Sequence, residues 1–445
     1  MRISRQAILE ILLFHFFLFL YWLTFPFKDE WWPTILLVVM VGILVLLEYR
    51  RTGLFIAPLL IWYVFWLGVI SVGRMDLHLY PFYQTWSRKL LNVVLINTAA
   101  FFWLYWIGEL FSSAFSKRSG KVSEENIHGE LLAFLTFGIL CVSVAAYAAN
   151  VAYKGYIPQL TGDANSYRQS FVLSPFYRIV NLLRFVFAIV PVAVAGTKIR
   201  SMKLALVVLT AVLMAMEMLS GWRSYTLQAM VLLLTSLFIV MKNGDRNNGK
   251  GQKRKNNSKK ALPIVFAACS LTLLFIGYIA VTRDSVGGAL RTKLRYVVYI
   301  LDMYIAPNFL NFQSGMNDLA VLGYPLYTAE AFWGLVTSWE KLPPYPPIDQ
   351  AIGAFNVSTY LLQPYVDLGI PGTVLWSAIA GLAAGLVFRN CISNTKSCRM
   401  ILLGIVNFAI LVMHNNFFFR ASSTVLWIAA GLCIDFLIYR KGKKI

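Results

Sequence analysis

The sequence predicts an all-α polytopic integral membrane protein with about twelve transmembrane helices. Of its 445 residues, 58% are hydrophobic and only 13% are charged, whereas soluble domains carry about 25% charged and about 45–50% apolar residues. The apolar residues also fall into runs of about 20, which is the length of helix that crosses a bilayer. The net charge of +20 is spread over many short loops, which favours contact with anionic lipid over binding to nucleic acid.

Twelve apolar runs give the expected spans in chain order. The first run follows a basic N-terminus, is long enough to cross the bilayer and lacks a small-residue cleavage site, so we expect it to be retained as a helix. The runs lie at 7–25, 33–48, 54–73, 90–112, 130–150, 178–197, 203–219, 224–241, 261–281, 371–388, 400–416 and 423–439.

The positions of the basic residues predict that both termini are cytoplasmic. If the N-terminus is inside, most of the 40 Lys and Arg residues fall in loops on that side, in agreement with the positive-inside rule. The segment 242–260 belongs to this face and is rich in Asn, Gly and Lys. Such a composition predicts a disordered basic loop that lies on anionic lipid headgroups.

Two long segments, 151–177 and 282–356, are predicted on the extracytoplasmic face. The second is the largest loop and is rich in Tyr, Trp, Pro and Gly. We expect it to form amphipathic helices and turns that pack on the outer mouth of the helix bundle. Because long loops in compact proteins are usually functional, we expect one transmembrane domain, 1–445, with its function on this face.

Arginine predominates among the basic residues predicted on the outer face, against the positive-inside bias. Its planar guanidinium offers paired donors that suit phosphate and pyrophosphate oxygens. Arg291 and Arg295 would share one face of a helix, Arg223 lies in a tight turn, and Arg184 lies within a span. The alternative is that these are interfacial side chains whose charged ends extend to water. The set comprises Arg74, Arg88, Arg168, Arg178, Arg184, Arg223, Arg283, Arg291, Arg295 and Arg420.

Two further residues are candidates for acid–base chemistry at the outer face. Asp367 precedes a backbone broken by Gly369, Pro371 and Gly372, which makes it a candidate general base or ligand; its alternative role is an N-cap of the following helix. His414 is the one histidine placed at the outer end of a span, where it is a candidate acid, base or ligand. Four acidic residues near cytoplasmic helix ends have basic neighbours and are expected to be structural: Glu10, Glu48, Glu109 and Asp435.

Short motifs in the second half of the chain resemble the bacterial oligosaccharide repeat-unit polymerases, the Wzy-type family of O-antigen and capsule synthesis. The segment 355–372 contains N-x-S-x-Y followed by Y-x-D-x-G-x-x-G, it follows a long outer loop, and an arginine lies in a G-x-R-S turn. The matching residues are Asn356, Tyr360, Tyr365, Asp367, Gly369, Gly372, Arg223 and Ser224.

This resemblance implies a GT-C-like glycosyltransferase of the bacterial cytoplasmic (inner) membrane. It would transfer a growing glycan from undecaprenyl pyrophosphate to a new lipid-linked repeat unit, building O-antigen or a related surface polysaccharide. Its partners would be that lipid-linked oligosaccharide, membrane lipid, and a chain-length regulator and flippase of the same pathway, but not nucleic acid. Fixed cations directed at the leaving pyrophosphate would stabilise the transition state, so no metal, nucleotide or other cofactor is expected.

The expected catalytic residues are Asp367 and His414. Related O-antigen ligases carry a His-Asn pair where this chain has Phe355 and Asn356, which favours a polymerase over a ligase and leaves the identity of the base open. The alternatives are a lipid-linked oligosaccharide flippase or transporter, and an O-antigen ligase-like transferase. The expected substrate-binding residues are Arg184, Arg223, Arg283, Arg291, Arg295, Asn356, Tyr360 and Arg420.

Glu217 and Arg184 are both predicted in the outer halves of their spans, where an unpaired charge is costly. Either they pair with each other, or Glu217 orients Arg223 while Arg184 faces the substrate. We favour the second arrangement, because an arginine neutralised by glutamate would be a poor ligand for pyrophosphate.

Overall fold

Every regular element in the described residues of the computed structural model is a helix, as the composition predicts. The described residues are 5–27, 30–74, 85–118, 129–161, 164–247, 305–331, 358–393, 396–416, 418 and 422–439. The predicted span 261–281 and most of the predicted outer loop 282–356 lie outside them.

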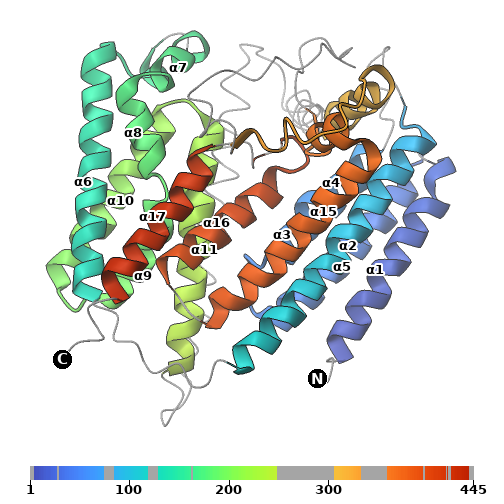
Figure 1. Ribbon diagram of the computed structural model, residues 1–445, viewed down its shortest axis with the longest axis horizontal. Helices are drawn as coiled ribbons and strands as arrows, with labels where there is room; N and C mark the ends of the chain where they lie inside the picture. Colours follow the sequence, from blue (N-terminus) through green and yellow to red (C-terminus); the bar gives the residue numbers. More distant parts are fainter. Residues whose placement is uncertain are drawn as a thin grey trace, which may run out of the picture.

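The elements run in chain order from blue to red (Figure 1). They are α1 (Arg5–Leu23), η1 (Phe25–Phe27), α2 (Trp31–Thr52), α3 (Pro58–Trp62), η2 (Tyr63–Gly68), α4 (Val69–Gly73), α5 (Arg88–Arg118), α6 (Gly129–Lys154), η3 (Pro158–Leu160), α7 (Ala164–Val172), α8 (Pro175–Leu183), α9 (Val186–Gly196), α10 (Arg200–Leu219), α11 (Arg223–Asn247), a helix over 305–318, α15 (Leu362–Ser393), α16 (Ser397–Val412) and α17 (Ser422–Tyr439).

Seven of the described helices are long and apolar enough to cross a membrane, namely α1, α2, α5, α6, α10, α11 and α15. An eighth span is formed if α8 and α9 are counted together, although their axes differ by 48°. Three shorter apolar helices, 58–73, α16 and α17, coincide with other predicted runs. The protein is therefore a polytopic α-helical membrane protein, while the figure of twelve spans stays a prediction.

Two predicted spans differ from the helices found. The single span expected over 178–197 is broken after Leu183, and the two pieces bend by 48°. The span expected at 371–388 begins earlier, at Leu362, and contains a kink at Gly369, whose φ of 68° and ψ of −154° are not helical. A residue with a side chain adopts a positive φ at a steric cost, so glycine permits this kink.

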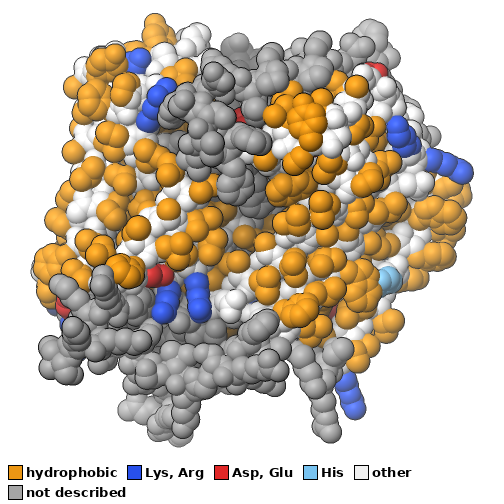
Figure 2. All heavy atoms as spheres, in the orientation of Figure 1, with side chains coloured by type: hydrophobic (Ala, Val, Ile, Leu, Met, Phe, Trp, Pro, Cys, Tyr) orange, Lys and Arg blue, Asp and Glu red, His pale blue; other side chains and the backbone are white. Residues whose placement is uncertain are grey.

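The start of α1 and the end of α17 lie at the same end of the bundle (Figure 1). We call this the terminal end and the opposite one the distal end. Figure 2 shows a broad hydrophobic belt between them, with Lys and Arg side chains towards its edges. This arrangement is typical of a protein whose middle faces lipid tails. By the predicted orientation the distal end is extracytoplasmic.

Helices α5 and α15 pack closely through small residues. Gly381 and Gly385 form a G-x-x-x-G pair on α15, and a Cβ atom added at either would overlap a carbonyl oxygen of α5, that of Phe101 or of Tyr105. On α5, Gly108 lies as close to the backbone of α15. Small residues let two membrane helices approach until their backbones touch, and the G-x-x-x-G spacing was a sequence signal for this contact.

Gly385→Ala is expected to destabilise the protein, because the added methyl group must push α5 and α15 apart. Overpacking of this kind costs roughly 1–3 kcal/mol, which thermal unfolding of the purified protein in detergent would detect. Gly138→Ala on α6 is the matched control, since nothing lies within 4 Å of a Cβ atom added there. Equal unfolding temperatures for the two variants would contradict the close contact.

Buried polar side chains join the same two helices. Asn97 on α5 donates to Thr373 Oγ1 (3.0 Å) and accepts from Ser377 Oγ (2.6 Å), both on α15. The hydroxyl of Tyr360, just before α15, hydrogen-bonds to Ser377 Oγ (2.6 Å). All four side chains are buried, and each satisfied bond fixes the rotation of the two helices relative to each other.

Candidate functional site at the distal end

The helix over 305–318 covers the distal end of α4. A Cβ atom added at Gly73 would lie 2.8 Å from the Ile305 side chain. The ring of Phe309 packs against Trp66 and Trp86, with centroids 5.7 and 4.9 Å apart. This part of the predicted outer loop therefore lies against the helix bundle at the distal end.

Asp367 fixes the segment that follows this helix. One carboxylate oxygen accepts from the backbone N–H of Tyr327 (3.0 Å), and the other accepts from the N–H and the hydroxyl of Thr328 (2.7 and 2.6 Å). Its main-chain carbonyl also accepts from the N–H of Gly323 (2.8 Å). The side chain thus bonds to a loop about 40 residues earlier in the chain and not, as the capping alternative proposed, to the start of the next helix.

The buried carboxylate also affects the neighbouring tyrosine. Burial, and then the negative charge of Asp367, raise the pKa of the Tyr327 hydroxyl. Tyr327 therefore keeps its proton at physiological pH.

Asp367→Asn is expected to loosen the segment 319–331. The carboxylate accepts hydrogen bonds through both of its oxygens, whereas the amide nitrogen of Asn is itself a donor and would face a backbone N–H group. Hydrogen bonds to a charged group are worth about 1.5–3 kcal/mol, so limited proteolysis within 319–331 should accelerate severalfold or more. Thr328→Val is the matched control, since it keeps the shape and removes one of the three bonds; a small effect is expected. Lost activity in Asp367→Asn with unchanged proteolysis would instead indicate a base.

Several buried polar atoms around this end make no hydrogen bond to any described residue. They are Nε and Nη2 of Arg74, Nε1 of Trp86, Oε1 of Gln363 and Nδ1 of His414. Such atoms are rare in folded proteins, because an unpaired buried donor or acceptor loses its hydration without compensation. Other such atoms lie elsewhere in the bundle, for example in Glu10 and Ser236, but those near 305–318 and the start of α15 lie beside Asp367 and Tyr360, which makes the distal end the candidate functional site.

His414 lies in the turn that follows α16. The residue is partly buried, and its Nδ1 atom has no hydrogen-bond partner among the described residues. A neutral imidazole with an unpaired nitrogen can accept a hydrogen bond or a proton. The role of His414 as an acid, base or ligand stays a prediction.

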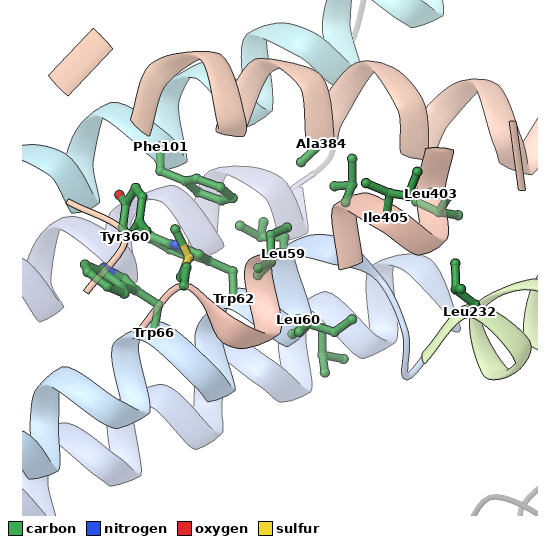
Figure 3. Close-up of a cluster of buried hydrophobic side chains, with 14 of the residues drawn as sticks. Leu59, Leu60, Trp62, Trp66, Phe101, Leu232, Tyr360, Ala384, Leu403 and Ile405 are labelled. Carbon is green, nitrogen blue, oxygen red and sulfur yellow. The ribbon is translucent and has the colours of Figure 1, made fainter. Parts of the chain in front are cut away.

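Tyr360 is built into the core of the distal end. Its backbone N–H donates to the carbonyl of Met413 (2.9 Å), its hydroxyl meets Ser377, and its ring packs edge-on against Trp66 (5.3 Å). Figure 3 shows Tyr360 beside Trp62 and Trp66 at one end of the buried hydrophobic cluster. Tyr360, Met413 and Asn416 line a small apolar pocket. These contacts position the segment; the predicted role in substrate binding stays a prediction.

The arrangement that we favoured for Arg184 was wrong, because Arg184 is paired with Glu217. The guanidinium donates from Nε to Glu217 Oε1 (2.9 Å) and from Nη2 to Oε2 (3.3 Å). Tyr177 donates to the same carboxylate (2.7 Å), Gln228 accepts from Arg184 Nη1 (3.2 Å), and the guanidinium lies over the ring of Tyr225, 4.1 Å from its centroid. Both charged side chains are fully buried. The ion pair between them neutralises both charges.

The broken span explains this pairing. Ser174 caps α8 by accepting from the N–H of Tyr177 (3.2 Å), and Pro175 occupies the first turn, where its missing N–H is harmless. The helix ends at Leu183, so Arg184 lies at the bend and reaches α10 and α11. A side chain at this position meets protein on all sides, and a buried charge requires a partner there.

The remaining predicted site residues are not placed by the described structure. Arg223 is the first residue of α11, and its side chain lies outside the description. The other five lie outside the described residues altogether: Arg283, Arg291, Arg295, Asn356 and Arg420.

A second polar cluster, at the terminal end, was not foreseen as a unit. Arg51 on α2 pairs with Glu48 (2.6 Å), with Glu109 on α5 (2.6 Å) and with Glu10 on α1 (3.6 Å). Tyr63 donates to Glu10 (2.7 Å). The three acidic residues were predicted to be structural, and they converge on one arginine; the contact between their helices could not be known from sequence.

Asp435, also expected to be structural, caps α16 by accepting from the backbone N–H groups of Ser397 (2.9 Å) and Cys398 (3.0 Å).

Within the described parts of the chain, no three His, Cys, Asp or Glu side chains are grouped so that they could hold a metal ion. The chain matches no protein-family model, no curated protein and no solved structure.

Proposed function

We propose that the protein is a glycosyltransferase of the oligosaccharide-polymerase type. It joins undecaprenyl-pyrophosphate-linked repeat units into O-antigen or a related surface polysaccharide at the extracytoplasmic face. The observation that supports this proposal is that Arg74, Gln363 and His414 have buried polar atoms without described partners at the distal end, where the outer arginines of the sequence are also expected. A flippase and a chain-length regulator of the same pathway would be its partners.

In the proposed reaction, the acceptor hydroxyl oxygen attacks the anomeric carbon of the donor glycan. The bond from that carbon to the pyrophosphate oxygen breaks, and the hydroxyl proton passes to a base. His414 is better suited to this role than Asp367, because its Nδ1 has no described partner, whereas the Asp367 carboxylate already accepts three hydrogen bonds. Arginines at the distal end would stabilise the charge on the leaving pyrophosphate.

A transporter of lipid-linked oligosaccharide is the second candidate function. Two features favour it: the broken span α8–α9 and the buried charges of the terminal end, since transporters use discontinuous helices and intramembrane carboxylates. Deletion of the gene separates the two functions. Loss of a polymerase should leave single repeat units at the cell surface, whereas loss of a flippase should remove surface units altogether.

Replacement of Arg291 or Arg295 by Ala is expected to abolish long polymer chains without lowering the amount of protein in the membrane. Replacement by Lys should restore little, because a point charge does not reproduce the bidentate guanidinium. Lys293→Ala is the matched control, because residue 293 falls off the face that 291 and 295 would share. Polymer length on a gel is the measurement, and full-length chains from both Ala variants would exclude them as pyrophosphate ligands.

A further inference from the structure

Arg74 is a buried cation for which the described residues supply no counter-charge. It follows the last residue of α4 and is 2% exposed. Its Nη1 donates to the carbonyl of Tyr21 (3.1 Å), and its guanidinium carbon lies 4.9 Å from the centroid of the Tyr21 ring. No ion pair joins it to a described carboxylate, and Nε and Nη2 have no hydrogen-bond partner among the described residues.

Two ordinary explanations for such an arginine do not apply. An interfacial arginine normally extends its charged end into water, but this one is almost fully covered. A buried lysine can lose its proton, whereas the guanidinium stays charged in proteins. A buried charge without a partner is strongly unfavourable, so an anion is required.

The unpaired atoms specify the shape of that anion. Nε–H and one Nη2–H point the same way along one edge of the guanidinium, which is the edge that binds two oxygens of a carboxylate or phosphate at once. The third nitrogen, Nη1, is already held by Tyr21. The side chain is therefore oriented by the protein, and no described residue occupies its bidentate edge.

The depth of Arg74 identifies the class of anion. Trp22 follows Tyr21 directly, and Trp31 and Trp32 begin α2 at the same end; these three side chains are 57%, 62% and 50% exposed. Exposed tryptophans at helix ends mark the level of the lipid headgroups. At this level the abundant anion is phosphate esterified to lipid.

We propose that Arg74 binds a lipid phosphate at the distal end, between the end of α1 and the helix over 305–318. Two sources have this chemistry: the headgroup of an ordinary phospholipid, and the pyrophosphate of a lipid-linked substrate. Binding of a phosphate does not depend on the proposed function, but the second source rests on it.

The test measures thermal unfolding of the purified full-length protein in a phosphate-free maltoside detergent. Phosphatidylglycerol, undecaprenyl pyrophosphate or a phosphate-free glycolipid of equal chain length is titrated in. We expect the phosphate lipids to raise the unfolding temperature of the wild type, and Arg74→Gln to weaken the apparent affinity about tenfold or more. Lys154→Gln, which removes a partly exposed cation from the end of α6, should leave the affinity unchanged.

Each outcome is decisive. Stabilisation by both phosphate lipids, or by phosphatidylglycerol alone, assigns a headgroup site; stabilisation by undecaprenyl pyrophosphate alone assigns the substrate. The headgroup result would stand even if deletion showed no polymerase defect. If Arg74→Gln does not fold, Arg74→Lys is compared, and it should bind more weakly because it lacks the fork. The proposal would be overturned if the phosphate lipids stabilised the wild type and Arg74→Gln equally, or if the phosphate-free glycolipid stabilised the wild type as well as they do. It would also be overturned if Asp76→Asn had the same effect as Arg74→Gln, since Asp76 would then be the partner of Arg74.

Discussion

Replacing Arg51 by Gln is expected to remove most of the folded protein from the membrane. This one guanidinium lies 2.6 Å from Glu48, 2.6 Å from Glu109 and 3.6 Å from Glu10, and all three carboxyl groups are buried. Breaking a single buried ion pair costs about 3–5 kcal/mol, against a total stability of about 5–15 kcal/mol for a typical protein. Here one substitution would leave three carboxyl groups on three helices without their cation.

The measurement is the yield of monodisperse protein after detergent extraction. Arg50→Gln is the matched control, because it removes an exposed arginine from the neighbouring position of the same helix. Adding Glu48→Gln to Arg51→Gln should recover part of the yield, since it removes one of the stranded charges. A normal yield of Arg51→Gln would show that these carboxyl groups do not depend on the arginine.

The second large effect is expected for the pair Arg184 and Glu217. Arg184→Gln or Glu217→Gln alone strands a fully buried charge and should lower the yield severely, by the same order of about 3–5 kcal/mol. The double variant removes both charges and should recover much of the yield, because two neutral amides can hydrogen-bond to each other. Arg178→Gln, an exposed position on α8, serves as the control and should leave the yield unchanged.

Polymer length distinguishes a structural pair from a substrate ligand. Since Arg184 is bound by Glu217, we expect the double variant to regain activity together with yield. If the double variant is well made but inactive, Arg184 contacts the substrate despite its pairing, and the original assignment would be restored.

Hydropathy predicted where helices occur but not which residues meet. Each predicted run outside 261–281 overlaps a described helix, because the length of an apolar run is set by the bilayer. The break at Arg184 could not be predicted, since no proline or glycine lies there; Pro191 is inside α9, which stays helical around it. A run such as 186–193, buried on every side, has the same composition as one that faces lipid.

For the polar residues too, the sequence indicates which side chains matter but not which residues they contact. Asp367 was recognised from its local sequence, but its carboxylate bonds to Tyr327 and Thr328, about 40 residues away. Arg184 and Glu217 were recognised as needing partners, because burial of a charge can be inferred from its position in a span. Which partner each one takes depends on helix packing, and sequence alone leaves that open.

The bonds from Asn97 to Thr373 and Ser377 join residues 276 and 280 positions apart, and this separation constrains the order of assembly. A ribosome adds about 5–20 residues per second, so α5 enters the bilayer tens of seconds before α15 is made. During that interval the amide of Asn97 and the groove at Gly108 have no permanent partner. The inserted N-terminal helices must therefore be held by the insertion machinery or by one another, and a chain that stops before residue 362 cannot complete this half of the protein.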